Sequence, residues 1–161
     1  MPINQVVVNA SPLICLSKSG LLDLLPSMFK DIVVPDLVVK EIMAKGGVGP
    51  NLGRWIKRIE DVPIAPQVAS WDMGDGESAV LSFAFSNKEY WAVIDDREAR
   101  RCAMSLGCRF TGTVGIIVLA KRRGIITSVS DSLEKLKNAG LWLSDSFVED
   151  VCKKSGERRR L

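Results

Sequence analysis

Residues 6–12 read Val-Val-Val-Asn-Ala-Ser-Pro, an apolar run that stops at the polar residue Asn9. Four of the six residues over 3–8 are apolar and β-branched, which predicts a strand that is buried on both faces, as in a parallel sheet. Ser11 and Pro12 are typical of a helix start, with serine as N-cap and proline at the first helical position. Open parallel sheets bind ligands beyond the carboxyl ends of their strands, so we expect Asn9 to lie near a ligand site.

Further along the chain, apolar and acidic residues adjoin in the same way. The segments concerned are residues 32–35, which open a helix carrying Glu41, residues 74–77, where Glu77 begins a very apolar helix, and residues 91–94, which stop at Asp95 and Asp96. Carboxylates that gather at one edge of a sheet repel one another unless a cation lies among them. The pattern therefore predicts a divalent-metal site, and such a site suggests phosphate chemistry.

The remaining periodicity predicts strands that alternate with helices. Strands are expected over residues 3–8, 31–34, 62–65, 90–94, 109–110 and 141–143. Helices are expected from residue 11 to near residue 20, over 21–25, from residue 35, near 51–60, and over 77–85, 97–106, 114–121, 130–138 and 145–154. This alternation indicates an α/β fold with a central parallel sheet covered by helices on both faces.

The length of 161 residues is enough for one domain with a substantial core. We assign residues 1–152 to that domain and residues 153–161 to a basic C-terminal tail. Residues 46–50, Gly-Gly-Val-Gly-Pro, are interpreted as a flexible loop, since a dinucleotide-binding glycine cluster would follow the first strand. The basic residues at 121–123 are interpreted as a helix end that offsets the helix dipole; contact with phosphate is the alternative.

Composition excludes several classes of protein. Histidine is absent, which rules out Ser-His-Asp and Cys-His catalysis and removes the usual imidazole ligands of zinc. No apolar run approaches the roughly 20 residues that span a bilayer. The N-terminus has no basic segment before its apolar run, so we expect a cytoplasmic protein without a signal peptide. The four cysteines form no Cys-x-x-Cys pair and are expected to be reduced and buried.

A family resemblance rests on four segments taken in order. Residues 6–14, Val-Val-Val-Asn-Ala-Ser-Pro-Leu-Ile, residues 33–41, Val-Val-Pro-Asp-Leu-Val-Val-Lys-Glu, and residues 74–80, Gly-Asp-Gly-Glu-Ser-Ala-Val, resemble segments of a PIN domain. Residues 94–103, Ile-Asp-Asp-Arg-Glu-Ala-Arg-Arg-Cys-Ala, followed by Thr-Gly-Thr-Val-Gly at 111–115, are similar to a prokaryotic branch of that family. The match covers most of the chain.

The resemblance implies a three-layer α/β/α PIN-like fold and a ribonuclease that depends on Mg²⁺ or Mn²⁺. It implies the toxin of a toxin–antitoxin pair, with RNA as substrate, an antitoxin protein as partner and a homodimer as the assembly. The acidic set of the family falls on Asn9, Glu41, Glu77 and either Asp95 or Asp96. Substrate contacts are expected from Ser11, which follows the first ligand, and from Arg97, Arg100, Thr111 and Thr113.

Asn9 departs from the family pattern, because most active members carry aspartate there. Its carbonyl oxygen can still ligate a cation, but the site loses one negative charge and should bind metal more weakly. The alternative function is therefore a non-catalytic module of the same fold that binds RNA or protein. Trp55, Trp71, Trp91 and Trp142 are candidates for stacking on RNA bases, although burial in the core or in a dimer interface is the favoured interpretation.

Overall fold

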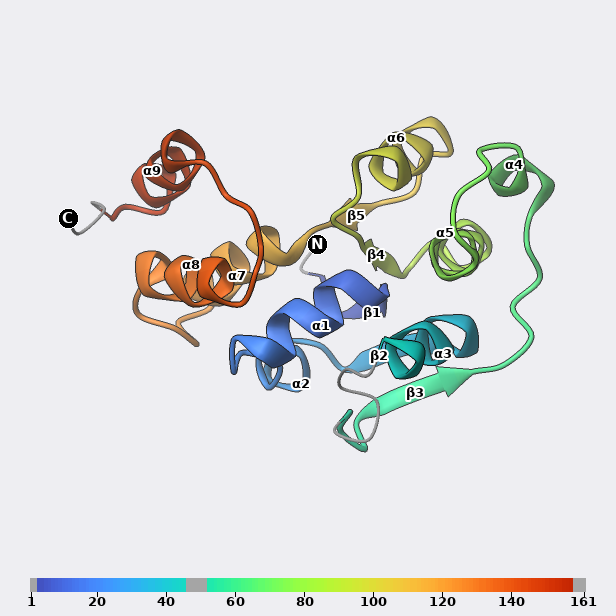
Figure 1. Ribbon diagram of the computed structural model, residues 1–161, viewed down its shortest axis with the longest axis horizontal. Helices are drawn as coiled ribbons and strands as arrows, with labels where there is room; N and C mark the ends of the chain where they lie inside the picture. Colours follow the sequence, from blue (N-terminus) through green and yellow to red (C-terminus); the bar gives the residue numbers. More distant parts are fainter. Residues whose placement is uncertain (1–2, 46–51, 158–161) are drawn as a thin grey trace.

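The computed structural model describes residues 3–45 and 52–157, and within them the chain forms a five-stranded parallel sheet flanked by helices, a three-layer α/β/α architecture. The strands are β1 (Gln5–Val8), β2 (Asp31–Pro35), β3 (Ile56–Ile59), β4 (Trp91–Val93) and β5 (Phe110–Thr111). The helices are α1 (Ala10–Lys18), α2 (Leu24–Met28), α3 (Asp36–Ala44), α4 (Pro66–Ala69), α5 (Asp75–Ser86), α6 (Arg97–Ser105), α7 (Thr113–Arg122), α8 (Val129–Asn138) and α9 (Asp145–Lys154). The predicted fold class is confirmed (Figure 1).

The sheet has the strand order β3-β2-β1-β4-β5, with β1 at its centre. Val6, Val7 and Val8 are completely buried because helices cover both faces of this strand. The chain adds β2 and β3 on one side of β1 and then returns to add β4 and β5 on the other. The order therefore reverses between β1 and β4, which is where open α/β sheets form their ligand crevices.

Helix α5 contacts β1, β2 and β4, while α3 contacts β2 and β3. Helix α1 packs against α7 and α8. Figure 1 shows α7, α8 and α9 gathered at one end of the molecule and α4 at the other. The N-terminus of α5 thus reaches the carboxyl edge of the sheet next to α3, which is how Glu41 and Glu77 come to face the same region.

The expected helix near residues 51–60 and the expected strand over 62–65 are both wrong. Residues 56–59 form the edge strand β3, which pairs with β2 in the register Ile32↔Ile56 to Pro35↔Ile59. Ile56 and Ile59 are half-buried while Lys57 and Arg58 are exposed, a pattern too short to signal a strand. The strand is stabilised by its pairing with β2 and by the ion pair between Arg58 and Asp36 of α3, and neither interaction can be recognised in the local sequence.

The strand expected over residues 141–143 is also absent: this segment is an irregular linker between α8 and α9.

Helix α1 begins at Ala10, so Asn9 and not Ser11 occupies the N-cap position. Pro26 lies inside α2 instead of ending a helix. It is tolerated because it falls in the first turn, where backbone N–H groups have no helical partner.

The cysteine prediction is confirmed: all four thiols are free and buried.

Lys153 and Lys154 lie in the last turn of α9, so the first two residues of the predicted tail belong to a helix. Residues 158–161 of that tail, and the loop predicted over 46–50, lie outside the described residues. In the described part of the chain no helix is long and apolar enough to cross a membrane.

Candidate functional site

The carboxyl ends of β1 and β4 bring the first two predicted site segments side by side. Val8 and Val93 are partners in the parallel ladder, and the Asn9 N–H donates to the carbonyl of Val93 at 3.1 Å. Ile94 in turn donates to the carbonyl of Thr111 at the end of β5. Asn9, Asp95 and Thr113 therefore follow three neighbouring strands at the same edge of the sheet.

Asn9 carries the most unusual polar atom of the site. The residue is only 4% exposed, and its Oδ1 has no hydrogen-bond partner among the described residues. Although Asn9 is the N-cap of α1, its side chain does not cap the helix. A buried oxygen without a partner costs about 1–3 kcal/mol. Such an oxygen suggests a partner that the polypeptide does not supply.

Gly76 allows Glu41 to approach this oxygen. A Cβ at Gly76 would lie 2.9 Å from Glu41 Oε2 and 3.7 Å from Asn9 Oδ1, so both oxygens border the space that glycine leaves free. The other Glu41 oxygen is 3.3 Å from Lys45 Nζ in a solvent-exposed ion pair. Exposed ion pairs contribute little to the free energy of unfolding, so the contact with Lys45 leaves Glu41 able to bind another cation.

Two other carboxylates, Asp96 and Glu41, are near enough to Glu77 to act on its charge. Burial in the first turn of α5 raises the pKa of Glu77, and the negative charges of Asp96 and Glu41 raise it further; Lys45 opposes them. Glu77 is thus held where its ionised form is disfavoured. A divalent cation is the kind of ligand that reverses this effect, since opposite charge favours the ionised carboxylate.

The structure separates the roles of the two adjacent aspartates. Asp96 is the N-cap of α6: its Oδ2 accepts a hydrogen bond from the Ala99 N–H at 3.0 Å. Asp95 accepts from both donors of Thr113, the backbone N–H at 2.8 Å and the hydroxyl at 2.5 Å. Burial raises the pKa of the Cys15 thiol on α1, and the negative charge of Asp95 raises it further.

The predicted set is therefore brought to one edge of the sheet but not into one closed cluster. Asn9 and Glu41 meet at Gly76, and Glu77 interacts electrostatically with Glu41 and Asp96. Within residues 3–45 and 52–157, no group of three or more His, Cys, Asp or Glu side chains is close enough to hold a metal ion. The oxygen-only donor chemistry fits Mg²⁺ or Mn²⁺, and ligation by these residues stays a prediction.

The predicted substrate contacts divide into exposed and buried positions. Ser11 is exposed at the mouth of a pocket of about 240 Å³ that Lys18 and Lys45 also line. Arg97 and Arg100 line a second pocket, of about 410 Å³, together with Asp95. Thr113 is completely buried, and its hydroxyl donates a hydrogen bond to Asp95. Thr113 therefore positions the Asp95 carboxylate and is not exposed to a substrate. Thr111 is half-buried at the end of β5.

Three features of the site were not predicted from the sequence. Lys45 lies close enough to Glu41 and Glu77 to offset part of their charge. Gly76 lets Glu41 and Asn9 approach the start of α5 closely, because it has no side chain there. The presence of a glycine directly before Glu77 is the sequence signal that could have indicated this close approach. Trp142 is 84% exposed, so burial in the core of this chain is wrong for that tryptophan, while burial in a dimer interface stays a prediction; no sequence signal distinguishes it from the other three.

Comparison with known proteins gives a match over nearly the whole chain. A protein-family model described as PIN domain matches residues 5–157. No curated protein matches the chain. The matched range runs from β1 through α9 and includes Asn9, Glu41, Glu77, Asp95 and Asp96.

Proposed function

The chain belongs to the PIN-domain family, a nuclease-type fold whose members generally use divalent metal ions, and on that premise we propose that it is an RNA endonuclease dependent on Mg²⁺ or Mn²⁺. The observation that carries the proposal is the buried, unpartnered Oδ1 of Asn9 beside the Glu41 carboxylate, with Glu77 destabilised as an anion nearby. All of these groups offer oxygen ligands, and Lys45 is the cation that opposes the charges of Glu41 and Glu77.

The proposed roles follow from the placement of each side chain. Asn9, Glu41 and Glu77 would hold the ion, with Asp96 or Asp95 completing the set. A divalent ion in such a site lowers the pKa of a bound water and stabilises the leaving oxygen of a phosphodiester. Thr113 holds Asp95 in a fixed orientation through its two hydrogen bonds. No histidine is present to act as general base, so the chain relies on its carboxylates.

The biological setting is part of the same proposal. We propose that the protein is the toxin of a toxin–antitoxin pair, acts on RNA in the cytoplasm as a homodimer, and is inhibited by an antitoxin protein. The support is the family membership, since toxins of this type belong to that family. A short reading frame encoded next to this gene, whose product binds the purified protein, is the expected observation.

The alternative function is a non-catalytic PIN-fold module that binds RNA or protein. Two observations favour it: asparagine replaces the usual aspartate at position 9, and the carboxylates do not form a closed cluster in the described residues. Loss of one negative charge weakens the attraction for a divalent ion. The two functions differ in whether metal stabilises the fold and supports cleavage.

The test compares Glu77→Gln with Glu60→Gln, which removes a charge from an exposed carboxylate after β3. For the wild type we expect cleavage of single-stranded RNA with millimolar Mn²⁺ or Mg²⁺, and a melting temperature that rises with metal because the ion binds only the folded state. Glu77→Gln should abolish cleavage and reduce the metal-induced rise, whereas Glu60→Gln should do neither.

Absence of metal-dependent cleavage over a broad RNA panel, with no thermal shift, would overturn the nuclease proposal and favour the module. A thermal shift that survives Glu77→Gln unchanged would contradict the placement of Glu77 at the metal.

A further inference from the structure

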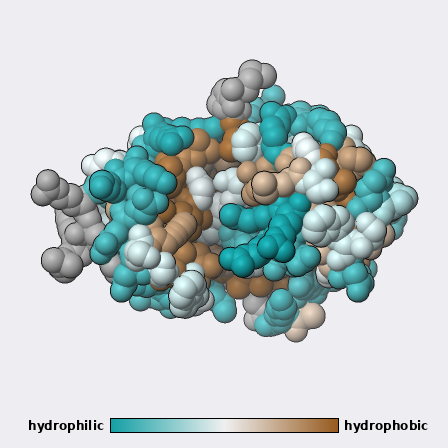
Figure 2. All heavy atoms as spheres, turned by 90° about the horizontal axis from the view of Figure 1, so that it is seen from above, coloured by the Kyte–Doolittle hydropathy of each residue, from teal (hydrophilic) through white to brown (hydrophobic). Residues whose placement is uncertain are grey.

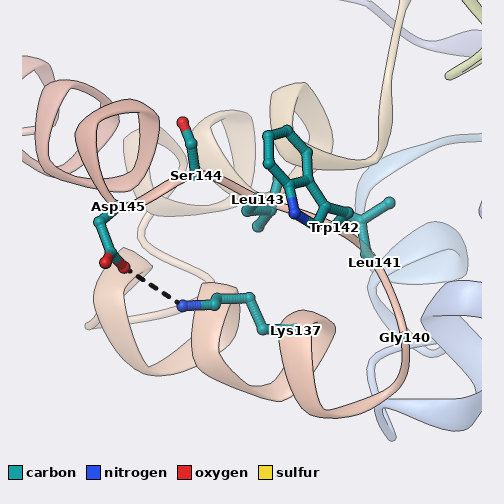
Figure 3. A pocket seen from close by; sticks show the side chains of 7 residues that line it. All are labelled: Lys137, Gly140, Leu141, Trp142, Leu143, Ser144 and Asp145. Carbon is teal, nitrogen blue, oxygen red and sulfur yellow. Dashed lines mark ion pairs between the residues drawn. The ribbon is translucent and has the colours of Figure 1, made fainter.

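The linker between α8 and α9 presents an indole to solvent. Trp142 is 84% exposed, and Figure 3 shows its ring projecting away from α8 and from Lys137. The linker rises from the end of α8 to the start of α9 in Figure 1. An exposed large hydrophobic residue by itself is ordinary, so the surroundings of Trp142 decide its meaning.

The backbone on both sides of Trp142 is fixed. Gly140 has φ +108°, and the Leu141 N–H donates to the carbonyl of Leu136 at 3.0 Å, which closes the end of α8. Ser144 caps α9 by accepting from the Phe147 N–H at 3.2 Å. Lys137 and Asp145 form an ion pair at 3.5 Å across the linker (Figure 3). The backbone that carries the indole is therefore held in place, which lowers the backbone entropy lost when a partner binds.

Trp142 is one wall of a groove that leads to the acidic site. This groove, which we name the Trp142 groove, has a volume of about 410 Å³ and is lined by Asp95, Arg97, Arg100, Leu141, Trp142 and Phe147, among others. Viewed from the side on which α6 and α9 lie, hydrophobic surface is visible between hydrophilic areas (Figure 2). The lining of the groove thus combines apolar and aromatic side chains with two arginines and one carboxylate.

The two arginines of the groove are available to an anion to different degrees. Arg97 is exposed and makes no hydrogen bond or ion pair with any residue in 3–45 or 52–157. Arg100 donates through Nε to the carbonyl of Ile94 at 3.1 Å, and its ring-facing guanidinium lies 5.7 Å from the centre of Phe110. The Ile94 contact anchors Arg100, so its remaining N–H groups keep a fixed direction.

We propose that the Trp142 groove seats single-stranded RNA, with an unpaired base stacked on Trp142 and phosphates against Arg97 and Arg100. The combination of an exposed aromatic face with cations along a groove is the chemistry that binds single strands. Asp95, which lines the same groove, places the strand next to the proposed cleavage site. The identity of the strand as RNA rests on the proposed function; the stacking and phosphate contacts rest on the groove itself.

The experiment measures binding without cleavage. A fluorescein-labelled mixed-sequence oligoribonucleotide is titrated with the full chain in EDTA, and anisotropy gives the dissociation constant. Trp142→Ala should weaken binding about five- to 150-fold, the usual effect of removing a stacking platform. Trp142→Phe should retain most of the affinity. Met104→Ala, which removes another exposed hydrophobic side chain from the outer part of α6, is the matched control and should bind normally.

Salt dependence separates stacking from charge. Arg97→Ala should reduce the slope of log K against log salt concentration by about 0.7, the value for one phosphate contact on a single strand. Trp142→Ala should leave that slope unchanged while lowering the affinity at every salt concentration. The same oligonucleotide annealed to its complement should bind more weakly, because its bases are no longer free to stack.

Equal affinities for wild type, Trp142→Ala and Met104→Ala would overturn the proposal, as would equal binding of duplex and single strand. Binding of phosphatidylserine vesicles that requires Trp142, with RNA binding unaffected, would also overturn it and assign the groove to a lipid surface. If metal-dependent cleavage fails but Trp142→Ala still loses RNA affinity in EDTA, the nuclease proposal falls and this one stands.

Discussion

Asn9 places an uncharged oxygen at a point where the family usually has a carboxylate. Its Oδ1 is buried, unpartnered among the described residues, and separated from Glu41 only by the space at Gly76. With asparagine the metal-free site contains one repulsive charge fewer, at a place where burial and the charges of Asp96 and Glu41 already raise the pKa of Glu77. Asparagine therefore favours a stable metal-free fold at the expense of metal affinity.

Asn9→Asp tests this directly. We expect the melting temperature in EDTA to fall by about 3–10 °C at neutral pH, since a buried charge is added without a partner. The rise in melting temperature on adding Mg²⁺ or Mn²⁺ should exceed that of the wild type. Asn138→Asp, at the exposed end of α8, is the control and should respond to metal as the wild type does. An unchanged metal response in Asn9→Asp would contradict the placement of residue 9 in the site.

Thr113→Val examines the hydrogen bonds that hold Asp95. The substitution keeps the shape of a completely buried side chain but removes the hydroxyl that donates to Asp95 Oδ2. The expected loss of unfolding free energy is about 1–3 kcal/mol. Urea denaturation measures it, with Thr127→Val, an exposed threonine, as the control. Identical denaturation midpoints for both variants would show that this hydrogen bond contributes nothing to stability.

At the scale of elements, helix α8 is capped from a distance by Glu157. Its Oε2 accepts from the Val129 N–H at 2.7 Å and its Oε1 from the Ser130 N–H at 3.2 Å, and Lys121 Nζ lies 3.0 Å away. A carboxylate at a helix N-terminus satisfies free N–H groups and complements the positive end of the dipole. Residues just beyond α9 therefore stabilise the start of α8.

Glu157→Gln should reveal this cap through its pH dependence. Burial opposes ionisation, but the hydrogen bonds from Val129, Lys121 and Ser130 lower the pKa of Glu157 below its ordinary value of 4.5. A carboxyl whose pKa is lower in the folded state stabilises the fold above its unfolded pKa and loses that effect as pH falls through the folded pKa. We expect Glu157→Gln to cost about 1 kcal/mol at pH 7.

The difference between Glu157→Gln and the wild type should shrink below pH 4.5, as measured by urea denaturation across a pH series. Glu149→Gln, which removes a charge from the exposed surface of α9, is the control. A difference that stays constant down to the folded pKa would show that the charge of Glu157 is not what stabilises α8.

At the scale of the whole molecule, Arg123 joins segments that are far apart in the sequence. Its two terminal nitrogens donate to the carbonyls of Met28 and Ile3, each at 2.6 Å, and its guanidinium lies 5.8 Å from the centre of the Phe29 ring. Lys121, in the same basic cluster, binds Glu157 and the carbonyl of Thr127. Two of these three cations therefore stabilise the fold, as opposed to the phosphate contact considered from the sequence.

Arg123→Lys should destabilise the protein by about 1–3 kcal/mol, because lysine cannot donate to two separated carbonyls in one fixed orientation. Arg122→Lys, one residue earlier and exposed, is the matched control and should change stability by less than about 0.5 kcal/mol. Thermal denaturation of both variants measures the difference. Equal melting temperatures would contradict the assigned role of Arg123.

Much of the architecture was predictable because it depends on local patterns. The apolar runs at β1, β2 and β4, each followed by a helix, are long enough to signal a parallel sheet, and that prediction is confirmed. Strand β3 was mistaken for a helix, since four residues with alternating exposure carry little signal. The strand predicted over 141–143 is wrong because a short apolar segment has the same local sequence pattern whether or not another strand is available to pair with it.

For the candidate site, the sequence by itself determined that Asn9 and the aspartate pair follow strands, that Glu77 opens a helix and that Glu41 lies on the helix after the second strand. Only the tertiary structure decided that Asp96 caps α6 while Asp95 turns to Thr113, that Gly76 separates Asn9 from Glu41, and that Trp142 reaches solvent. The reason is physical: strand ends follow from nearest neighbours in the chain, whereas hydrogen-bond partners and exposure depend on residues brought together from far apart.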